Sequence, residues 1–548
     1  MRPNTCRPVT ILLLLVLFLL VVISACTNQS TQSTISNPQS TNVATSEQGS
    51  ATLTPQSTIL NPQSTITPIN NPQSTNVATG AQGSATLTPL STILNPQSTF
   101  TPIGNPQSTI INPQYFLSAQ FDFYLRSLSV DETITYTNNT AQPLNDLLLV
   151  VPANRWPGAF QLRGIHWADG TPTLDFSLHI HRLSILLPQP LLPGGQVSLS
   201  LTYNLTLPPI PDPSEAAPQP FGYTSSQSNL VDWYAYLPPY KDGWLVHDPG
   251  FWGEYQVFEA GDFQIDLTLV DAPAGLVVAA SAPPLDTAQE DGSTYRYQLE
   301  SARTFALSLS PSYQVFSQTV DLGSSSVVVY SYAYVFGVDA GQAALAETAR
   351  AVELYSELFG PYPHASLSVV EADFLDGMEY DGLYFLSKGF YNLYDGTPNG
   401  YLTAIAVHET AHQWWYGLVG NDQALEPWLD EALCAFTERV YYEHFYPEAL
   451  VKWWQPYRVD YYDPAGLVGE SIYDYISYRA YRDAVYLNGQ AFLQAVRLRV
   501  GDQAFFAFLK DYIVRYRGQI ATGQDFFALL ATHSDVEITD LVKEFFGK

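Results

Sequence analysis

The chain has 548 residues, of which 46% are hydrophobic, so it is long enough for two or three domains with cores of ordinary size. Its 52 acidic residues against 23 basic ones leave a formal charge of -29, which would repel the phosphate backbone of nucleic acids. Nucleic acid is therefore not expected as a partner. With three cysteines, the chain is not a small disulfide-stapled scaffold either.

Residues 1–26 have the layout of a secretory signal. Two arginines precede a largely apolar run from Val9 to Ile23, which is short for a membrane span of about 20 residues. The run ends in Ile-Ser-Ala-Cys, which resembles the lipobox of bacterial lipoproteins, where the signal is cut before a cysteine that receives lipid. We therefore expect lipidation at Cys26 and a protein anchored on the outer side of the cell membrane. An uncleaved anchor helix is the alternative, and it also places the rest outside the cytoplasm.

Residues 27–113 consist mainly of Ser, Thr, Asn, Gln and Pro with scattered single apolar residues. Such a composition offers no apolar face that could form a core. The segment that begins at Asn37 returns from Asn71 with few changes, which is a repeat of 34 residues. Because the repeat carries no helical apolar pattern, we interpret this part as a disordered stalk rather than a solenoid.

Residues 114–335 alternate apolar and polar side chains, as half-buried strands do. From Val197 to Leu207 every second residue is apolar, and the stretch from Phe263 to Leu269 repeats the pattern. Pro, Gly and Asp separate such stretches. This arrangement predicts an N-terminal domain built from a large antiparallel sheet or sandwich.

Residues 336–548 show mainly a helical period. The first helical run starts after Asp339 and stops at Gly360, and a strand-like piece covers Ser366 to Val370. A Tyr-rich stretch, 441–486, reads as a connection. The sequence therefore predicts an α+β protein whose second domain is mainly helical.

The segment His408-Glu409-Thr410-Ala411-His412 lies in a run from Leu402 to Trp415 that contains neither Pro nor Gly. The run can therefore be a continuous helix. Residues four apart share one face of a helix, so both imidazoles can reach one tetrahedral Zn²⁺, with Glu409 beside the position of a metal-bound water. The five-residue pattern needs a third ligand to be convincing.

Glu431 supplies a third ligand. Pro427 suits a first helical turn, and the apolar residues that follow lie on a different side of the helix from Glu431. A carboxylate at that place completes a His₂Glu site. The alternative is that Glu431 is one of many solvated acids that favour helix N-termini. The 18 residues between His412 and Glu431 argue against that alternative.

The spacing between His412 and Glu431 and the sequence around these residues resemble the aminopeptidase N (membrane alanyl aminopeptidase) family of gluzincin zinc metallopeptidases. HETAHQWW is similar to the family's HELAHQWF, and PWLDEALCAFTE is similar to its WLNEGFA segment. The resemblance implies one Zn²⁺ per chain held by His408, His412 and Glu431, with Glu409 as general base. It also implies a saddle-like β domain before a thermolysin-like catalytic domain. Only about 60 residues follow the matching motifs, so this is expected to be a short form without the family's C-terminal helical domain.

Two further segments match the family in part. Asp376-Gly377-Met378-Glu379-Tyr380 resembles its Gly-Ala-Met-Glu-Asn exopeptidase motif, which implies that Glu379 binds the amino terminus of the substrate, with Gly377 and Met378 beside it. A carboxylate facing an ammonium is a strong charge-assisted anchor. Gly stands where Ala is usual and Tyr where Asn is usual, so strict aminopeptidase action is less firmly implied than zinc binding.

Tyr486, in Tyr-Leu-Asn-Gly, resembles the tyrosine of the family's Tyr-x-Lys-Gly segment, whose hydroxyl stabilises the oxyanion. Glu438, seven residues after Glu431, resembles a further acid of the family, and a solvated acid is the alternative.

Together these residues predict removal of N-terminal residues from extracellular peptides. Zinc would lower the pKa of its water, and Glu409 would take the proton as the water attacks the scissile carbonyl. Two alternatives remain. One is an endopeptidase with the same chemistry. The other is a non-catalytic surface-binding lipoprotein whose zinc is structural, with Cys434 as a fourth ligand.

Overall fold

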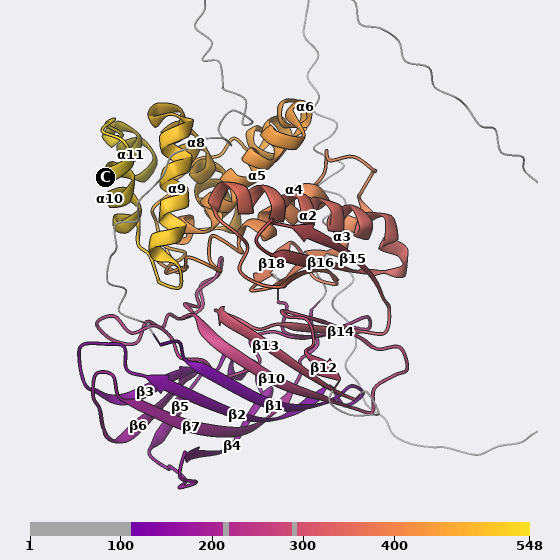
Figure 1. The fold of residues 1–548 in the computed structure, drawn as a ribbon, viewed down its shortest axis with the longest axis vertical. Helices are drawn as coiled ribbons and strands as arrows, with labels where there is room; N and C mark the ends of the chain where they lie inside the picture. Colours follow the sequence, from indigo (N-terminus) through magenta and orange to yellow (C-terminus); the bar gives the residue numbers. More distant parts are fainter. Residues whose placement is uncertain (1–110, 212–218, 288–292, 548) are drawn as a thin grey trace, which may run out of the picture. The chain divides into compact units, whose positions relative to one another are not determined.

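The structure is a computed structural model, and it describes residues 111–211, 219–287 and 293–547. The signal pattern, Cys26 and nearly all of the expected stalk lie outside the described residues. Among the helices within those ranges, none combines the length and apolarity needed to cross a membrane. The fold is α+β, as predicted: strands fill the first part and helices dominate the second (Figure 1). We call the described residues up to 312 the β domain and the described residues from Tyr313 the helical domain.

Three sheets build the β domain. The largest runs in the order β12 (Asp286–Thr287), β13 (Thr294–Ala302), β10 (Gly261–Val270), β1 (Gln114–Asp122), β2 (Ser127–Thr137), β7 (Gln196–Thr206), β4 (Phe160–Trp167). The second is β3 (Leu144–Val150), β6 (Arg182–Leu191), β5 (Phe176–His179). The third is β11 (Val277–Ala280), β14 (Leu307–Ser310), β9 (Ser228–Leu230), β8 (Gly222–Tyr223).

The alternation of the sequence places the core of the β domain. In β7 the side chains of Leu199, Leu201, Tyr203 and Leu205 are fully buried, and the polar residues between them are partly exposed. One-sided burial of this kind is what period-2 strands require. The sheet is antiparallel except for β1 and β10, which run parallel in a register that stacks the rings of Tyr115 and Phe263.

One carboxyl group lies in this core. Glu132 of β2 is fully buried, and its Oε2 accepts hydrogen bonds from the Tyr203 hydroxyl at 2.9 Å and the Ala235 N–H at 3.0 Å. Its other oxygen has no partner among the described residues. Burial raises the pKa of Glu132 to about 8, against the opposing effect of the two hydrogen bonds.

This raised pKa predicts a pH-dependent stability. Between the ordinary glutamate pKa and about 8, the folded protein holds a proton that the unfolded chain releases, so stability falls as the pH rises through this window. Glu132→Gln, which keeps an acceptor oxygen and cannot ionise, is expected to flatten that decline. Urea unfolding of both proteins at pH 5, 6.5 and 8 measures it. Equal slopes in the two proteins would contradict the assignment.

A five-stranded sheet opens the helical domain, in the order β15 (Tyr313–Asp321), β16 (Ser326–Tyr334), β17 (Ser366–Ala372), β19 (Leu383–Ser387), β18 (Gly377–Tyr380). The hairpin β15–β16 precedes residue 335, where composition changes, yet β16 pairs with β17 in parallel. Alternation of side chains reveals a strand but not the sheet that it joins. The hairpin therefore belongs structurally with the helices.

The longer helices are α2 (Val338–Phe359), α4 (Tyr401–Ala411), α5 (Glu431–Phe445), α8 (Gly489–Val500), α9 (Asp502–Tyr516), α10 (Gly523–His533) and α11 (Thr539–Phe546). The shorter pieces are η3 (Val335–Gly337), α3 (Lys388–Asn392), η4 (Pro427–Leu429), α6 (Pro447–Ala449), η5 (Leu450–Val459), η6 (Asp460–Tyr462), α7 (Tyr478–Arg482) and η7 (Asp483–Asn488). The connection expected over 441–486 is thus largely helical, and η5 and η7 are π-helical. Such turns follow no apolar period, which explains why the sequence did not reveal them.

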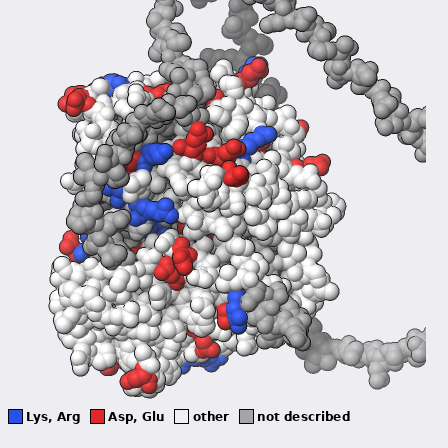
Figure 2. Space-filling view, in the orientation of Figure 1, with Lys and Arg blue, Asp and Glu red and all other residues white. Residues whose placement is uncertain are grey.

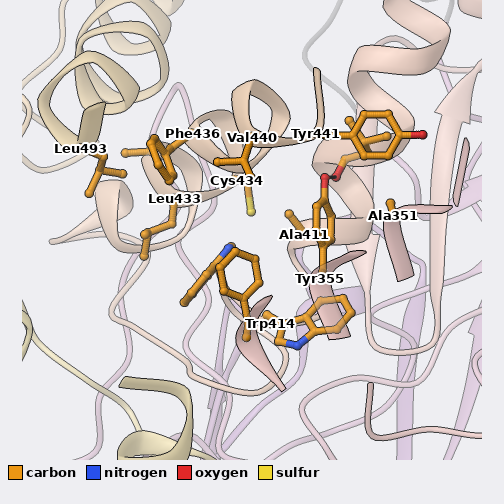
Figure 3. Close-up of a cluster of buried hydrophobic side chains, with 14 of the residues drawn as sticks. Ala351, Tyr355, Ala411, Trp414, Leu433, Cys434, Phe436, Val440, Tyr441 and Leu493 are labelled. Carbon is orange, nitrogen blue, oxygen red and sulfur yellow. Dashed lines mark hydrogen bonds between the residues drawn. The ribbon is translucent and has the colours of Figure 1, made fainter. Parts of the chain in front are cut away.

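The packing of α4 against α5 fixes two parts of the site. Figure 3 shows Leu433, Phe436 and Val440 of α5 on the side of a buried cluster that also holds Ala411 and Trp414. This is the apolar stripe expected from the sequence, and it is fully buried. Interior packing of this density leaves α4 and α5 little freedom to shift relative to each other.

A buried arginine joins the two domains. The guanidinium of Arg303, in the β domain, donates to the carbonyl oxygens of Tyr416 at 2.6 Å and Gln519 at 2.9 Å. The N–H groups of Arg303 and Thr304 both donate to the Asp381 carboxylate, at 2.8 and 3.1 Å. Asp381 lies directly after strand β18. The β domain therefore holds the end of that strand.

Charged side chains are sparse on the surface. On the face shown in Figure 2, most of the surface is uncharged, and the basic and acidic groups that do appear lie in small mixed clusters. Charged residues make up 14% of the chain, which accounts for this appearance.

Candidate metal centre and active site

Helix α4 carries the two histidines on one face. The helix ends at Ala411, earlier than the expected Trp415, but His412 keeps helical angles and its N–H bonds the His408 carbonyl at 3.3 Å. The chain then turns, and the N–H groups of Trp414 and Trp415 both bond the Ala411 carbonyl. The two histidines therefore keep the geometry of residues four apart on a helix, although α4 itself ends at Ala411, one residue before His412.

Helix α5 brings Glu431 to the same place. Asp430 caps the helix, because its Oδ1 accepts the Glu431 N–H at 2.9 Å. The preceding turn η4 begins at Pro427, as the sequence indicated. Glu431 is buried, so the alternative of a solvated acid does not describe it.

The three donor atoms form a compact triangle. His408 Nε2 lies 3.1 Å from Glu431 Oε2 and 3.2 Å from His412 Nε2, and His412 Nε2 lies 3.5 Å from Glu431 Oε2. A tetrahedral zinc ion with bonds of about 2.0–2.1 Å separates its ligand atoms by about 3.3–3.4 Å. The separations and the donor types therefore fit Zn²⁺.

The far side of His408 is held by a second carboxylate. Its Nδ1 lies 2.9 Å from Glu438 Oε1, and Glu438 also accepts from Trp454 Nε1 and Arg458. Burial alone would raise the pKa of Glu438, but the Arg458 charge and the His408 contact hold it below its usual range. Glu438 is fully buried and fixes the orientation of the His408 ring, the usual role of a carboxylate behind a metal-binding histidine.

The side chain of Glu409 projects from α4 towards Gly377 of strand β18. Burial raises the pKa of its carboxyl well above the usual range, and within the described chain its Oε2 has no hydrogen-bond partner. A Cβ added to Gly377 would lie 2.1 Å from Glu409 Oε1. The glycine that departs from the family motif is therefore the residue that makes room for the Glu409 carboxylate.

Strand β18 brings Glu379 and Met378 beside this group. Glu379 is buried, and one of its carboxylate oxygens lies within 4.8 Å of donor atoms of both Glu409 and His412. Burial raises the pKa of Glu379, opposed by the charge of His412. Met378 is partly buried and packs on the core of the β domain. Glu379 is thus a buried carboxyl group close to the metal-binding residues and not an ordinary surface acid.

Tyr486 reaches the site from the π-helical turn η7. Its hydroxyl donates to Glu431 Oε1 at 2.5 Å, and its ring stacks on that of His408 with centroids 5.8 Å apart. Apart from Cys26, the eight predicted site residues thus lie together, on α4 and the residue that follows it, α5, β18 and η7. π-helical turns frequently occur at functional sites because they turn one side chain out of the regular helical register.

Cys434 lies one turn after Glu431 and is buried with a free thiol. Donor atoms of His408, His412 and Cys434 lie within 4.8 Å of one another. Burial raises the pKa of this thiol, so the neutral form is favoured.

Comparison with known proteins agrees with this geometry. Residues 343–545 match the profile of the peptidase family M1 domain. We call residues 343–545 the M1 domain. The M1 domain contains every predicted zinc-binding and catalytic residue, and the family indicates a zinc peptidase.

Curated proteins with similar sequences include aminopeptidases. Aminopeptidase N of Lactobacillus delbrueckii subsp. lactis is 28% identical over 211 residues, which are 35% of this chain and 25% of that enzyme. Aminopeptidase M1-D of Oryza sativa subsp. japonica is 27% identical over 237 residues, which are 38% of this chain and 26% of that protein. The chain thus aligns with about a quarter of the length of these curated relatives.

Solved structures show the fold of both domains. An M1 zinc metallopeptidase mutant from Deinococcus radiodurans superposes with a TM-score of 0.59 at 19% identity, covering 79% of this chain and 94% of that one. The same mutant bound to a Tyr-Ser-Ala substrate gives a TM-score of 0.58, also at 19% identity, covering 80% and 94%. The match includes the β domain as well as the M1 domain.

Several residues around the site of the M1 domain carried no sequence signal. Gln423 and Asp430 are buried beside Glu379 and Glu431, and Gln413 is buried against the turn after β18. Trp454 and Arg458 donate hydrogen bonds to Glu438. Gln413 and Asp430 each adjoin a predicted ligand, which was the available hint. Nothing in the sequence marked the other three, because their roles depend on contacts between distant segments.

Proposed function

We propose that the protein is a zinc-dependent aminopeptidase that removes single residues from the amino terminus of extracellular peptides. The observation that carries the proposal is the position of Glu379, with a carboxylate oxygen within 4.8 Å of donor atoms of Glu409 and His412. The amino nitrogen and the carbonyl carbon of one residue are about 2.5 Å apart, and each further residue adds about 3.5 Å. The space between Glu379 and the reacting groups thus suits one residue.

The residues of the site divide the reaction among them. Zinc, when bound by His408, His412 and Glu431, supplies a Lewis acid that activates water and polarises a carbonyl group. Glu409 takes a proton from the attacking water and returns it to the leaving amine, and its carboxylate lies within 4.8 Å of a donor atom of His412. The Glu379 carboxylate binds the substrate ammonium and so sets which bond is presented.

Tyr486 is placed to donate its hydroxyl hydrogen bond to the carbonyl oxygen as negative charge develops. We expect Tyr486→Phe to lower kcat about 100-fold with little change in KM, the loss typical of one oxyanion donor. Tyr391→Phe is the matched control, because the Tyr391 hydroxyl is buried without a partner among the described residues. Steady-state kinetics on an alanyl fluorogenic substrate measures the effect. An unchanged kcat in Tyr486→Phe would remove the tyrosine from the mechanism.

The test of the proposed function compares free and N-acetylated aminoacyl fluorogenic substrates, with and without a chelator. Zinc-dependent cleavage of the free substrates alone supports an aminopeptidase. Cleavage of both kinds supports the endopeptidase alternative. Glu379→Gln is expected to reduce the preference for free substrates, because the charged partner of the ammonium is lost.

The structural-zinc alternative depends on Cys434, whose thiol lies near both histidines. Cys434→Ala is expected to retain one zinc per chain and wild-type hydrolysis, because three protein ligands and an open position define a catalytic site. Metal analysis and kinetics on the purified variant test this. Loss of zinc from Cys434→Ala, without unfolding, would favour a closed structural site.

We further propose that the protein is a lipoprotein on the outer side of the cell membrane, attached through Cys26. The support is the signal pattern of residues 1–26 and the residues that precede Cys26. Metabolic labelling with a fatty acid, compared between the wild type and Cys26→Ser, tests it. Equal labelling of both would overturn the assignment.

A further inference from the structure

Glu379 is the last residue but one of β18, and the turn that follows is tied to the metal-binding helix. Gln413, directly after His412, donates from Nε2 to the Tyr380 carbonyl at 3.0 Å and accepts at Oε1 from the Gly382 N–H at 3.0 Å. Both ends of its amide therefore bond the backbone of one turn. Gln413 is 2% exposed, so water does not compete for these bonds.

The same turn is also held from the opposite side. A Cβ on Gly382, which has a φ of +70°, would lie 1.9 Å from the Ser281 carbonyl oxygen. Asp381 bonds the N–H groups of Arg303 and Thr304. The turn after β18 is thus confined between the β domain and Gln413, and Gln413 is its link to His412.

A second glutamine contacts the carboxylate of Glu379 itself. Gln423 is 4% exposed, and its Nε2 lies 2.9 Å from Asp430 Oδ2 and 3.5 Å from Glu379 Oε1. Asp430 in turn accepts the Glu431 N–H through its other oxygen. One amide nitrogen therefore connects Glu379 with the first turn of the helix that carries Glu431.

An amide suits this position for a physical reason. A glutamine NH₂ group has two hydrogens and no charge, so it can orient two carboxylates without neutralising either. A lysine at the same place would cancel the charge that a substrate ammonium needs. The amide of Gln423 therefore fixes the direction of the Glu379 carboxyl group without placing a positive charge beside it.

We propose that Gln413 and Gln423 are positioning residues that hold Glu379 at a fixed place relative to His412 and Glu431, and so determine how strongly the site prefers a free amino terminus. This inference rests on the proposed aminopeptidase function. Gln413 sets the position of the strand, and Gln423 sets the direction of the carboxylate. Neither residue touches the reacting atoms.

The test measures recognition of the amine separately from catalysis. Leucine hydroxamate and its des-amino counterpart both bind an active-site metal, and they differ only in the ammonium, so the ratio of their inhibition constants reports the contribution of Glu379. We expect this ratio to fall about ten-fold in Gln423→Met, the change typical of losing a hydrogen bond to a charged group. We expect a similar fall in Gln413→Met, because two buried hydrogen bonds to the backbone of the turn after β18 are lost. Inhibition by the des-amino compound and the zinc content are expected to stay at wild-type values.

Gln490→Met is the matched control, because Gln490 is a buried glutamine of α8, 3% exposed, whose Oε1 lacks a partner among the described residues. Its ratio is expected to equal that of the wild type. If Gln413→Met does not fold, Gln413→Glu replaces it, since glutamate keeps the acceptor for Gly382 and loses the donor for Tyr380.

The possible outcomes distinguish failure of the positioning role from failure of the proposed aminopeptidase function. A wild-type ratio in Gln423→Met and in the Gln413 variant, with zinc retained, overturns the positioning role and leaves the aminopeptidase function standing. A wild-type protein that binds both hydroxamates equally and does not cleave free aminoacyl substrates overturns the proposed function instead. A reduced ratio in both variants, with an unchanged control, supports the inference.

Discussion

Glu409→Gln is expected to lower kcat by about 1,000-fold while zinc stays bound, the loss typical of removing a general base. Glutamine has the size of glutamate and cannot take a proton from water. The proposed metal ligands are other residues, and Glu409 Oε2 has no hydrogen-bond partner in the described part of the chain, so the substitution is expected to leave His408 and His412 in place. The measurement is kcat on an alanyl fluorogenic substrate together with the zinc content per chain.

Glu347→Gln is the control for this prediction. Glu347 is a buried acid of α2 whose carboxylate accepts from the hydroxyls of Tyr441 and Tyr446, away from the metal-binding residues. Glu347→Gln also replaces a buried carboxyl group by an amide of the same size. This variant is expected to keep kcat near the wild-type value. A Glu409→Gln variant that retains more than about a tenth of the activity would be incompatible with a general base at this position.

Gly377→Ala is expected to lower kcat by about 100-fold, because a displacement of about 1 Å at a reacting group can cost that much. The added Cβ would lie 2.1 Å from Glu409 Oε1 and 2.6 Å from its Cδ. Glu409 projects from a helix packed on all sides, so the carboxylate has to rotate away from its present position. The backbone at Gly377 does not have a positive φ, so the contact with Glu409 is the source of the effect.

Gly400→Ala provides the comparison. Gly400 precedes α4, its φ of −162° is an ordinary extended angle, and a Cβ there meets nothing within 4 Å. This variant is expected to keep wild-type kcat and zinc content. A wild-type kcat in Gly377→Ala would show that Glu409 works equally well in a displaced position. The close approach of Gly377 to Glu409 would then not contribute to catalysis.

The sequence could indicate the residues of the proposed metal centre because the signals that mark them are local. Two histidines on one helical face follow from a four-residue spacing, and Glu431 follows from the start of the next helix. The same reasoning predicted the α+β fold, since alternation and helical period are both read from short windows. The pairing of β16 with β17 depends on residues far apart in the chain, and no short window contains it.

The surroundings of Glu379 could not be predicted for the same reason. Gln423 contacts a residue 44 positions away, and Gln413 contacts a turn 31 to 33 positions away. The family motif marked Glu379 but treated Gly377 as a weak match. The distance from Gly377 to Glu409 gives that departure a physical reason.

The contacts of Asp381 limit where the chain can be cut to produce a fragment with an intact site. A fragment that starts at residue 336, where the composition changes, would leave β17 without its neighbour β16 and the Asp381 carboxylate without the donors of Arg303 and Thr304. Unsatisfied buried carboxylates are costly, so the turn after β18 would be expected to rearrange and carry Glu379 with it. The proposed selectivity for the amino terminus would therefore depend on both domains, and a functional fragment would have to include the strands that precede residue 336.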